Sequence, residues 1–503
     1  MTEINLFTVP PASLHTIAAA LPYLAGHLMA RGHHVRIVDL NVELARSCAP
    51  SGAISRLMGQ IIDADDVAGL ALAEQELNAW QEVAFGDPAP SIDASWADVA
   101  RRAEVIPAQV IEHLAATMIR ENAIHEGLIG VSCLGQDQLA VALRMARRVK
   151  AIDPAAVVIA GGPMLTTASR CFPDAPPLDA FDYIIANNGA TAFEALLDTI
   201  GHPEVSVPND IVSVDRSEVQ VRLKSIGLPM GRPEPPMFPP ALIAGVLSPR
   251  PVLPVFSAQG CSYGECNFCS SQRAVTPYRP TMMRWIVAEM DRLHTEHGVS
   301  DFDIVDNNFD PRRIGALVAA LGDGRRRYRW KATARFYEEF DVPFLRSAVD
   351  AGCGLLCLGL ESYDDDSLAA MQKGYTTATI DRVLKAAHAV DLPVHLYAIV
   401  GHPSETLHGR RATLDFLRDE QHLYTSAYLQ VYDANLSAGV FVSTAQGDHD
   451  TMAGSVANLL GELTNDMPEL QMHADHGGVL VRRPGHPRCE ELLFLALNDA
   501  SRR

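Results

Sequence analysis

Short hydrophobic runs alternate with longer segments of helical periodicity in the first 200 residues of the chain. The runs are typical of buried strands, and the segments between them repeat apolar residues at helical spacing. Buried strands that alternate with helices form a parallel sheet with helices on both faces, so the pattern predicts a doubly wound, Rossmann-like α/β domain. The predicted strands cover residues 4–10, 34–41, 127–133, 155–163 and 181–189.

Two parts of the N-terminal half depart from this alternation. Residues 42–122 are rich in Ala, Asp and Glu and contain helical runs, so we expect a helical insertion within a domain that spans residues 1–200. The insertion serves either as scaffold or as a cap over the edge where ligands bind. Residues 201–254 are rich in proline and lack periodicity, which predicts a semi-rigid linker between two domains.

A second alternation of strands and helices covers residues 255–434. About six strand–helix units follow one another, which predicts a (β/α)6 partial TIM barrel whose active face lies at the carboxyl ends of its strands. The last part of the chain, residues 435–503, is expected to form a small C-terminal region. Four candidate functional residues fall at predicted strand ends of the barrel, namely Cys261, Asp306, Glu361 and Gly401.

The composition excludes several classes of protein. The net charge is −20 and the sequence pI is near 5.3, which argues against a nucleic-acid partner because such binding needs a basic footprint. No apolar run approaches the roughly 20 residues of a membrane span. The N-terminus has no signal-peptide layout, so we expect a soluble, cytoplasmic protein with no membrane partner. Nine cysteines among 503 residues do not make a disulfide framework.

Three of the cysteines lie close together in the stretch QGCSYGECNFCSS. They are one ligand short of the four that structural zinc sites and closed iron–sulfur clusters use. Either another residue such as Cys353, Cys357 or a histidine completes the set, as in a zinc knuckle, or one iron of a cluster stays open for a substrate. Gly260 and Gly264 permit the tight turns that a loop around a cluster needs. The three candidate ligands are Cys261, Cys266 and Cys269.

The cysteine stretch resembles the cluster loop of radical S-adenosylmethionine (SAM) enzymes, with C-x4-C-x2-C here in place of the usual C-x3-C-x2-C. GVSDFDIVDNNF is similar to their second barrel strand, LLCLGLESYDDDSLAAMQKGYT to their fourth-strand block and LYAIVGHPSET to their fifth-strand block. These blocks and the layout of the first 200 residues resemble the subgroup with an N-terminal cobalamin-binding-type domain. The resemblance covers residues 4–41, 127–200 and 251–432.

The resemblance implies that the three cysteines hold a [4Fe–4S] cluster whose fourth iron is chelated by SAM. An electron from a donor such as flavodoxin or ferredoxin would then cleave SAM to a 5′-deoxyadenosyl radical, which removes hydrogen from an unactivated carbon. An alternative for the fourth-strand residues is a strand-end carboxylate with a helix-capping serine. The further SAM contacts implied are Phe268, Val400 and Gly401 beside the adenine, Glu361 with its neighbour Ser362 at the ribose or amino group, and Asp306 with Asn307 at the amino group.

For the N-terminal domain the resemblance implies bound cobalamin, with its nucleotide tail against the sheet. The residues implied are Ser132, Gly161, Gly162 and Gly189, which follow predicted strands. The D-x-H-x-x-G motif does not occur in the N-terminal half, so we expect no histidine to ligate the cobalt from below. An acidic run typical of many members is replaced by Asn188, Gly189 and Ala190.

The other cysteines and a group of histidines are given structural interpretations. Cys133, Cys353 and Cys357 lie in apolar strands, which favours buried core thiols. The histidines in the C-terminal region surround a glycine pair and either contact substrate or are solvated. They are His473, His476 and His486.

Three hypotheses for the function follow. The first is a cobalamin-dependent radical SAM methyltransferase acting on a small-molecule or peptide-derived substrate. The second is a radical SAM enzyme for cyclisation, rearrangement or sulfur insertion, with or without cobalamin. The third is a non-enzymatic zinc or iron–sulfur binding module.

Overall fold

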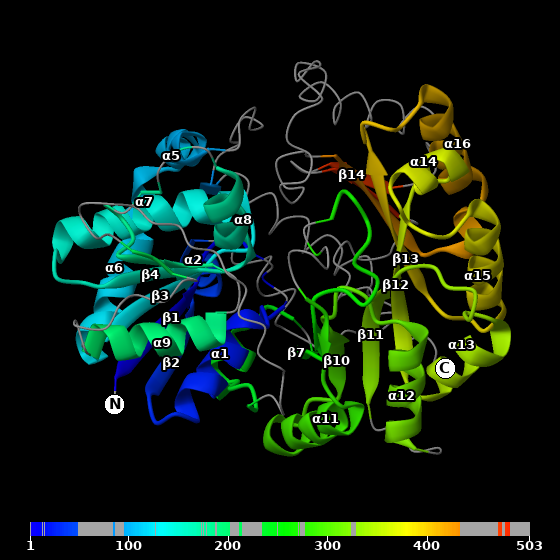
Figure 1. Cartoon of the computed structure of the whole chain (residues 1–503). Coiled ribbons are helices and arrows are strands. Elements are labelled where there is room, and N and C mark those ends of the chain that lie inside the picture. The colour runs from blue at the N-terminus through cyan, green and yellow to red at the C-terminus, as the bar shows by residue number, and fades with distance from the viewer. Residues whose placement is uncertain are drawn as a thin grey trace. The chain divides into compact units, whose positions relative to one another are not determined.

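The computed structural model describes most of the chain in two compact units, the first ending at Pro251 and the second beginning at Val252 (Figure 1). Each unit is considered by itself. The described residues are 2–12, 14, 16–48, 84–85, 95–125, 127–172, 174, 176–177, 179–186, 189–201, 211–213, 234–248, 250–269, 271, 277–322, 328–432, 471–474 and 478–482.

The first unit is built on a six-stranded sheet in the order β2-β1-β3-β4-β5-β6. The first five of these strands are parallel, and β6 runs antiparallel to β5. The predicted doubly wound sheet is therefore confirmed, with one short antiparallel edge strand added. The strands are β1 (Glu3–Thr8), β2 (His34–Asp39), β3 (Leu128–Ser132), β4 (Val158–Gly161), β5 (Tyr183–Ile185) and β6 (Ile211–Ser213).

Helices cover both faces of this sheet because successive strand residues point to opposite sides. In β1, Ile4 and Leu6 pack in one core with Phe193 of α9, whereas Phe7 packs in the other core with Leu139 of α7. Figure 1 shows the sheet between these two helical layers. The helices are α1 (Ala20–Met29), α2 (Leu40–Cys48), α5 (Trp96–Val105), α6 (Ala108–His125), α7 (Gln136–Ile152), α8 (Pro163–Cys171), α9 (Gly189–Gly201) and α10 (Pro240–Gly245).

Parts of the predicted insertion and linker pack on this unit. Trp96 of α5 and Leu114 of α6 are buried in the same core as Leu139, which is the behaviour of a scaffold. In the predicted linker, the N–H of Met237 donates to the Pro22 carbonyl at 2.9 Å, and that of Leu247 donates to Leu14 at 2.8 Å. Residues 49–83 and 86–94 of the insertion and most of residues 202–233 lie outside the described residues.

The second unit is built on an eight-stranded sheet in the order β15-β16-β14-β13-β12-β11-β10-β7. The six strands from β7 to β14 are parallel, as predicted for a (β/α)6 partial barrel, while β16 and β15 continue the sheet antiparallel. The strands are β7 (Val252–Val255), β10 (Asp301–Ile304), β11 (Arg329–Ala334), β12 (Cys353–Glu361), β13 (Val394–Val400), β14 (Ser426–Val431), β15 (Gln471–Ala474) and β16 (Gly478–Arg482).

Four of the six α-helices described in the barrel, α12, α13, α14 and α16, begin at a residue whose side chain caps the first turn. Asp310, Asp341, Asp364 and Thr406 each accept a hydrogen bond from a backbone N–H in the first turn of the helix that follows. The helices are α11 (Met283–His297), α12 (Pro311–Leu321), α13 (Val342–Asp350), α14 (Asp365–Ala370), α15 (Thr377–Ala389), α16 (Leu407–Asp419) and the 3-10 turn η2 (Gln421–Leu423). None of the helices in the described ranges is both long and apolar enough to cross a membrane.

Candidate functional site

The three candidate ligand cysteines lie on one loop that follows the first barrel strand. The loop leaves β8 (Ala258–Gln259), a short strand paired with β9 (Arg279–Pro280). Gly260 and Gly264 adopt left-handed φ angles of 70° and 66°, which the sequence analysis anticipated from their glycine identity. The backbone N–H of Gly264 donates to the Cys261 sulfur at 3.3 Å, so the loop is wound around a thiol.

The three thiols are half-buried and act on one another. Burial raises the pKa of Cys266 to about 11 and also raises that of Cys269, so binding iron requires the loss of protons that these thiols otherwise hold. The Cys269 sulfur accepts a hydrogen bond from the backbone N–H of Ser271 at 3.3 Å. In the described parts of the chain, no three such side chains converge on the position of one metal ion. Three thiols on one loop are the donor set that a [4Fe–4S] cubane with one open iron takes, and because each thiolate binds a different iron they need not converge on one point.

A short turn after α14 holds the cysteine loop in place. The backbone N–H of Asn267 donates to the Met371 carbonyl at 3.3 Å, and its side-chain amide donates to Ala370 at 2.7 Å. The Tyr263 hydroxyl donates to the Gln372 carbonyl at 2.7 Å, and Arg335 donates to that of Lys373. Four consecutive carbonyls at the end of a helix are thereby satisfied by residues around the cysteine loop.

Glu361 ends β12 beside this loop in a strained conformation. Its φ of 58° is rare for a residue other than glycine, and the register between β12 and β13 shifts at the same point. Its carboxylate accepts a 2.9 Å hydrogen bond from Nζ of Lys373, and both side chains are buried. Burial opposes protonation of Lys373, but the Glu361 carboxylate outweighs it, so the pKa of Lys373 lies above its ordinary value. The acid implied for SAM binding thus lies at the cysteine loop.

Ser362 and Asp306 contact the protein itself. Ser362 is 1% exposed and its hydroxyl lies 3.2 Å from that of Thr413 on α16, so it does not cap a helix. The carboxylate of Asp306 accepts from the backbone N–H groups of Ser257 and Ala258 at 2.8 and 3.0 Å and from the Ser257 hydroxyl. Burial raises the pKa of Asp306, and these hydrogen bonds oppose the shift. Direct contact of either residue with SAM stays a prediction.

Asn308, two positions beyond Asp306, is hydrogen-bonded to the cysteine loop, whereas the hydrogen bonds of Asp306 go to Ser257 and Ala258. Its amide donates to the Ser262 hydroxyl at 2.7 Å, and its oxygen accepts from the backbone N–H of Arg335 at 3.1 Å. The guanidinium of Arg335 lies 3.7 Å from the ring centroid of Tyr263. Residues that follow the second and third barrel strands therefore also contact the cysteine loop.

The end of β13 and the cysteine loop together form an apolar wall. Phe268 packs against the buried cluster of Met371, Ile399 and Tyr432, and its ring centroid lies 6.3 Å from that of His402. Gly401 follows Val400 with a left-handed φ of 86°. Phe268 thus contacts Ile399 and His402, the residues on either side of Val400 and Gly401, and the contact of these residues with adenine stays a prediction. Burial lowers the pKa of His402, so its ring is neutral near pH 7.

The four residues implied for cobalamin lie at the carboxyl edge of the first sheet. Ser132 and Gly161 are register partners at the ends of β3 and β4. Gly162 has a φ of 108°, and a Cβ there would lie 2.4 Å from the Cys133 carbonyl oxygen, so only glycine fits. Gly189 begins α9, and a Cβ there would meet no atom of the described residues within 4 Å. The residues implied for cobalamin are therefore small and lie at the edge where such sheets bind ligands, and their contact with cobalamin stays a prediction.

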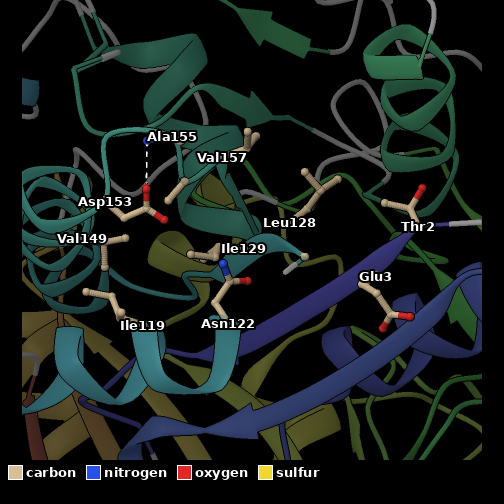
Figure 2. A pocket seen from close by; sticks show the side chains of 12 residues that line it. Thr2, Glu3, Ile119, Asn122, Leu128, Ile129, Val149, Asp153, Ala155 and Val157 are labelled. Atoms are coloured by element: carbon tan, nitrogen blue, oxygen red, sulfur yellow. Dashed lines mark hydrogen bonds between the residues drawn. The ribbon is translucent and has the colours of Figure 1, made fainter. Parts of the chain in front are cut away.

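The pocket shown in Figure 2 lies at the other edge of the same sheet. It has a volume of about 370 Å³ and includes Glu3 and Leu128, the first residues of β1 and β3. On its rim, the N–H of Ala155 donates to the Asp153 carboxylate at 3.0 Å. Doubly wound sheets bind ligands outside the carboxyl ends of their strands, so this pocket is on the edge that such ligands do not use.

The remaining candidates have mixed outcomes. Cys133, Cys353 and Cys357 are all buried, as expected of core thiols, and burial raises the pKa of Cys133 and Cys353. His473 lies in β15 and pairs in register with Leu480, so the expected glycine-rich loop is a strand at this point. His476 and His486 lie outside the described residues.

Sequence reasoning missed several residues of this site. Lys373 and Glu405 stand inside the two quoted segments MQKGYT and HPSET, so their positions alone could have marked them. His402 and Asn308 also stand inside quoted segments, HPSET and GVSDFDIVDNNF, whereas Arg335 lies outside them. The contacts of all three join segments far apart in the sequence, so only the fold brings them together.

A six-stranded parallel partial barrel with three loop cysteines after its first strand, beside a strained strand-end glutamate, defines the radical SAM class of enzymes. Residues 255–417 match the Radical SAM superfamily. The chain therefore carries a radical SAM domain, and the prediction of an enzyme of this superfamily is confirmed. Enzymes of this superfamily need a reductant.

Two curated methyltransferases are similar to parts of the chain. An uncharacterised methyltransferase of Pyrococcus horikoshii is 25% identical over 167 residues, which are 33% of this chain and 36% of the relative. Bacteriochlorophyllide d C-12(1)-methyltransferase of Chlorobaculum tepidum is 26% identical over 198 residues, 37% of this chain and 42% of the relative. The matched part is less than half the length of either relative.

Two solved structures share the fold over nearly the whole chain. OxsB, a cobalamin-dependent SAM radical enzyme with aqua-cobalamin and SAM bound, aligns with a TM-score of 0.55 and 14% identity, covering 97% of this chain and 57% of that chain. TsrM from Kitasatospora setae, a radical SAM methyltransferase with cobalamin and a [4Fe–4S] cluster bound, aligns with a TM-score of 0.56 and 14% identity. This alignment covers 96% of this chain and 88% of that chain. The predicted fold, a Rossmann-like domain followed by a radical SAM barrel, is confirmed.

Proposed function

We propose that the chain is a cobalamin-dependent radical SAM methyltransferase that acts on an unactivated carbon of a natural-product or peptide-derived substrate. The observation that carries the proposal is the cysteine loop of Cys261, Cys266 and Cys269 clamped beside Glu361 in a radical SAM domain. The fold shared with cobalamin-dependent enzymes over most of the chain and the two methyltransferase relatives favour methyl transfer over the other radical reactions.

In this proposal the cluster and cobalamin would supply the electron and the methyl carrier when bound. The chain's own residues bind and orient. The three cysteines hold iron, Glu361 accepts hydrogen bonds from the ribose or amino group of SAM, and Phe268 with the Val400–Gly401 turn supports the adenine. At the edge of the first sheet, the small residues Ser132, Gly161, Gly162 and Gly189 would admit the cobalamin tail. A flavodoxin or ferredoxin is the electron donor we propose.

The test begins with anaerobic reconstitution of the whole chain with iron, sulfide and cobalamin. We expect four irons per chain, a corrin absorption band that stays with the protein on gel filtration, and 5′-deoxyadenosine when SAM and a reductant are added. Cys266→Ala should lose iron and 5′-deoxyadenosine. The matched control is Cys357→Ala, which removes a buried thiol from β12 and should retain both.

The products separate the competing functions. A mass gain of one methyl group on a candidate substrate supports methyl transfer, whereas a product without that gain supports cyclisation, rearrangement or sulfur insertion. A protein that binds one zinc ion and releases no 5′-deoxyadenosine would be a binding module. Failure to retain cobalamin would overturn the cobalamin-dependent part of the proposal alone.

A further inference from the structure

Lys373 is a buried lysine at the centre of the candidate site. It is 5% exposed, and Nζ lies 2.9 Å from Oε1 of Glu361. The same ammonium lies 5.6 Å from the ring centroid of Phe268 and 5.5 Å from that of Tyr375. A buried ammonium is tolerated when a carboxylate and aromatic rings compensate its desolvation, and both are present here.

The ammonium also lies beside the cysteine loop, because Phe268, whose ring centroid is 5.6 Å from Nζ, directly precedes Cys269. Burial raises the pKa of Cys266 and of Cys269, and the positive charge of Lys373 opposes that shift in both thiols. Glu361 acts on both thiols in the opposite sense. One side chain therefore links the acid implied for SAM binding with two of the three iron ligands.

The backbone holds Lys373 in this position. Its carbonyl accepts from Arg335, while the carbonyls of the three preceding residues accept from Tyr263 and Asn267. Gly374 follows with a φ of 67°, and a Cβ there would lie 2.6 Å from the Tyr263 hydroxyl oxygen. The lysine is thus fixed relative to the cysteine loop and moves with it.

Three thiolates and the Glu361 carboxylate gather negative charge in a half-buried site. Net charge and hydrogen bonding around a cluster set its reduction potential, because a nearby cation favours the more negative, reduced state. We propose that Lys373 is a positioning residue that raises the reduction potential of the cluster and holds Glu361 in the orientation that receives SAM. This inference rests on the proposed function and assigns Lys373 a role in it.

The experiment is an anaerobic redox titration of the reconstituted, SAM-free protein, followed by electron paramagnetic resonance. Lys373→Met should make the reduction potential of the cluster more negative than in wild type. Lys373→Arg keeps the positive charge, so its potential should lie close to the wild-type value. The matched control is Lys331→Met, which removes the lysine of another buried ion pair, with Asp303 at 3.1 Å, and should leave the potential unchanged. Lys373→Met should also weaken binding of S-adenosylhomocysteine by about tenfold, since a charged hydrogen bond that orients Glu361 is lost.

Glu361→Gln provides a test of opposite sign. It removes negative charge and leaves the lysine in place, so the cluster potential should become less negative even if Lys373→Met does not fold. Potentials equal to wild type in whichever of the two variants retains four irons would overturn the inference. A wild-type protein that never assembles a cluster would instead overturn the proposed function, so the two failures are distinguishable.

Discussion

The backbone N–H of Gly401 donates a 2.8 Å hydrogen bond to Oε2 of Glu405, and the same oxygen accepts from Nε of Arg410 at 2.9 Å. This contact closes the turn that leaves β13 and gives Gly401 its left-handed conformation. The turn carries His402 to the ring of Phe268 on the cysteine loop. A carboxylate four residues downstream therefore shapes the proposed adenine wall.

Glu405→Ala should open this turn, because Gly401 and Arg410 lose their acceptor. We expect a loss of about 2 kcal/mol in unfolding free energy and weaker binding of S-adenosylhomocysteine. Denaturant unfolding and calorimetric titration measure the two effects. Asp415→Ala is the matched control, because it removes an exposed partner of Arg418 on α16 and should change stability by less than about 0.5 kcal/mol. Unchanged affinity in Glu405→Ala would contradict the role of the turn.

Two glycines at the carboxyl edge of the first sheet should respond differently to alanine. Gly162→Ala places a Cβ 2.4 Å from the Cys133 carbonyl oxygen at a φ of 108°, so we expect destabilisation of about 3 kcal/mol or more. Among the described residues, a Cβ at Gly189 meets no atom within 4 Å, so Gly189→Ala should remain within about 0.5 kcal/mol of wild type. Thermal unfolding compares the pair.

Gly189→Ala also tests the predicted contact with the cobalamin tail. If the backbone approaches the tail at this point, the added methyl group should weaken cobalamin retention although the fold is intact. Equilibrium dialysis followed by the corrin absorbance measures the affinity. An affinity equal to that of wild type would remove Gly189 from the cobalamin site.

Asp306→Asn should be destabilising even though the side chains have the same shape. Both carboxylate oxygens accept hydrogen bonds, two from backbone N–H groups and one from the Ser257 hydroxyl, and an amide NH2 cannot accept. We expect a loss of about 2 kcal/mol, because a buried donor is left without an acceptor. Urea unfolding of the variant and of Asp415→Asn, which changes an exposed carboxylate on α16, provides the comparison. Equal stabilities would contradict this account of Asp306.

Asp39 should make the first unit less stable as the pH rises. Burial raises the pKa of this carboxyl to about 6 from 3.8, although the N–H groups of Asn41 and Val42 donate to it. Between these two pH values the native state holds a proton that the unfolded chain has released, so stability falls from about pH 4 to pH 6 and is constant above.

Asp39→Asn keeps an acceptor for the two N–H groups and has no charge to desolvate. Its advantage over wild type should be absent near pH 3 and reach about 1 kcal/mol above pH 6, after allowance for partial exposure of the side chain. Melting temperatures of both proteins across this range measure the difference. A constant difference at all pH values would show that the titration of Asp39 is not the cause.

The sequence by itself predicted most of the architecture. Five strands of the first sheet and six of the barrel lie where hydrophobic runs were found, because burial on both faces leaves a local apolar signal. The loop of Cys261, Cys266 and Cys269 was also predicted from the sequence, because all three cysteines lie within nine residues. The short antiparallel strands β6, β15 and β16 have too few residues to show the two-residue periodicity of a strand. They are strands because β6 pairs with β5, β16 with β14 and β15 with β16.

What only the tertiary structure decided is which residues meet. Glu361 and Lys373 stand twelve positions apart on either side of α14, and their pairing requires the turn that returns the chain to the cysteine loop. Asp306 was expected to face SAM. Its hydrogen bonds with Ser257 exist because β7 and β10 pair side by side, which the sequence does not show. Periodicity reports whether a residue is buried, whereas charge compensation and hydrogen bonding depend on neighbours that the fold brings from distant segments.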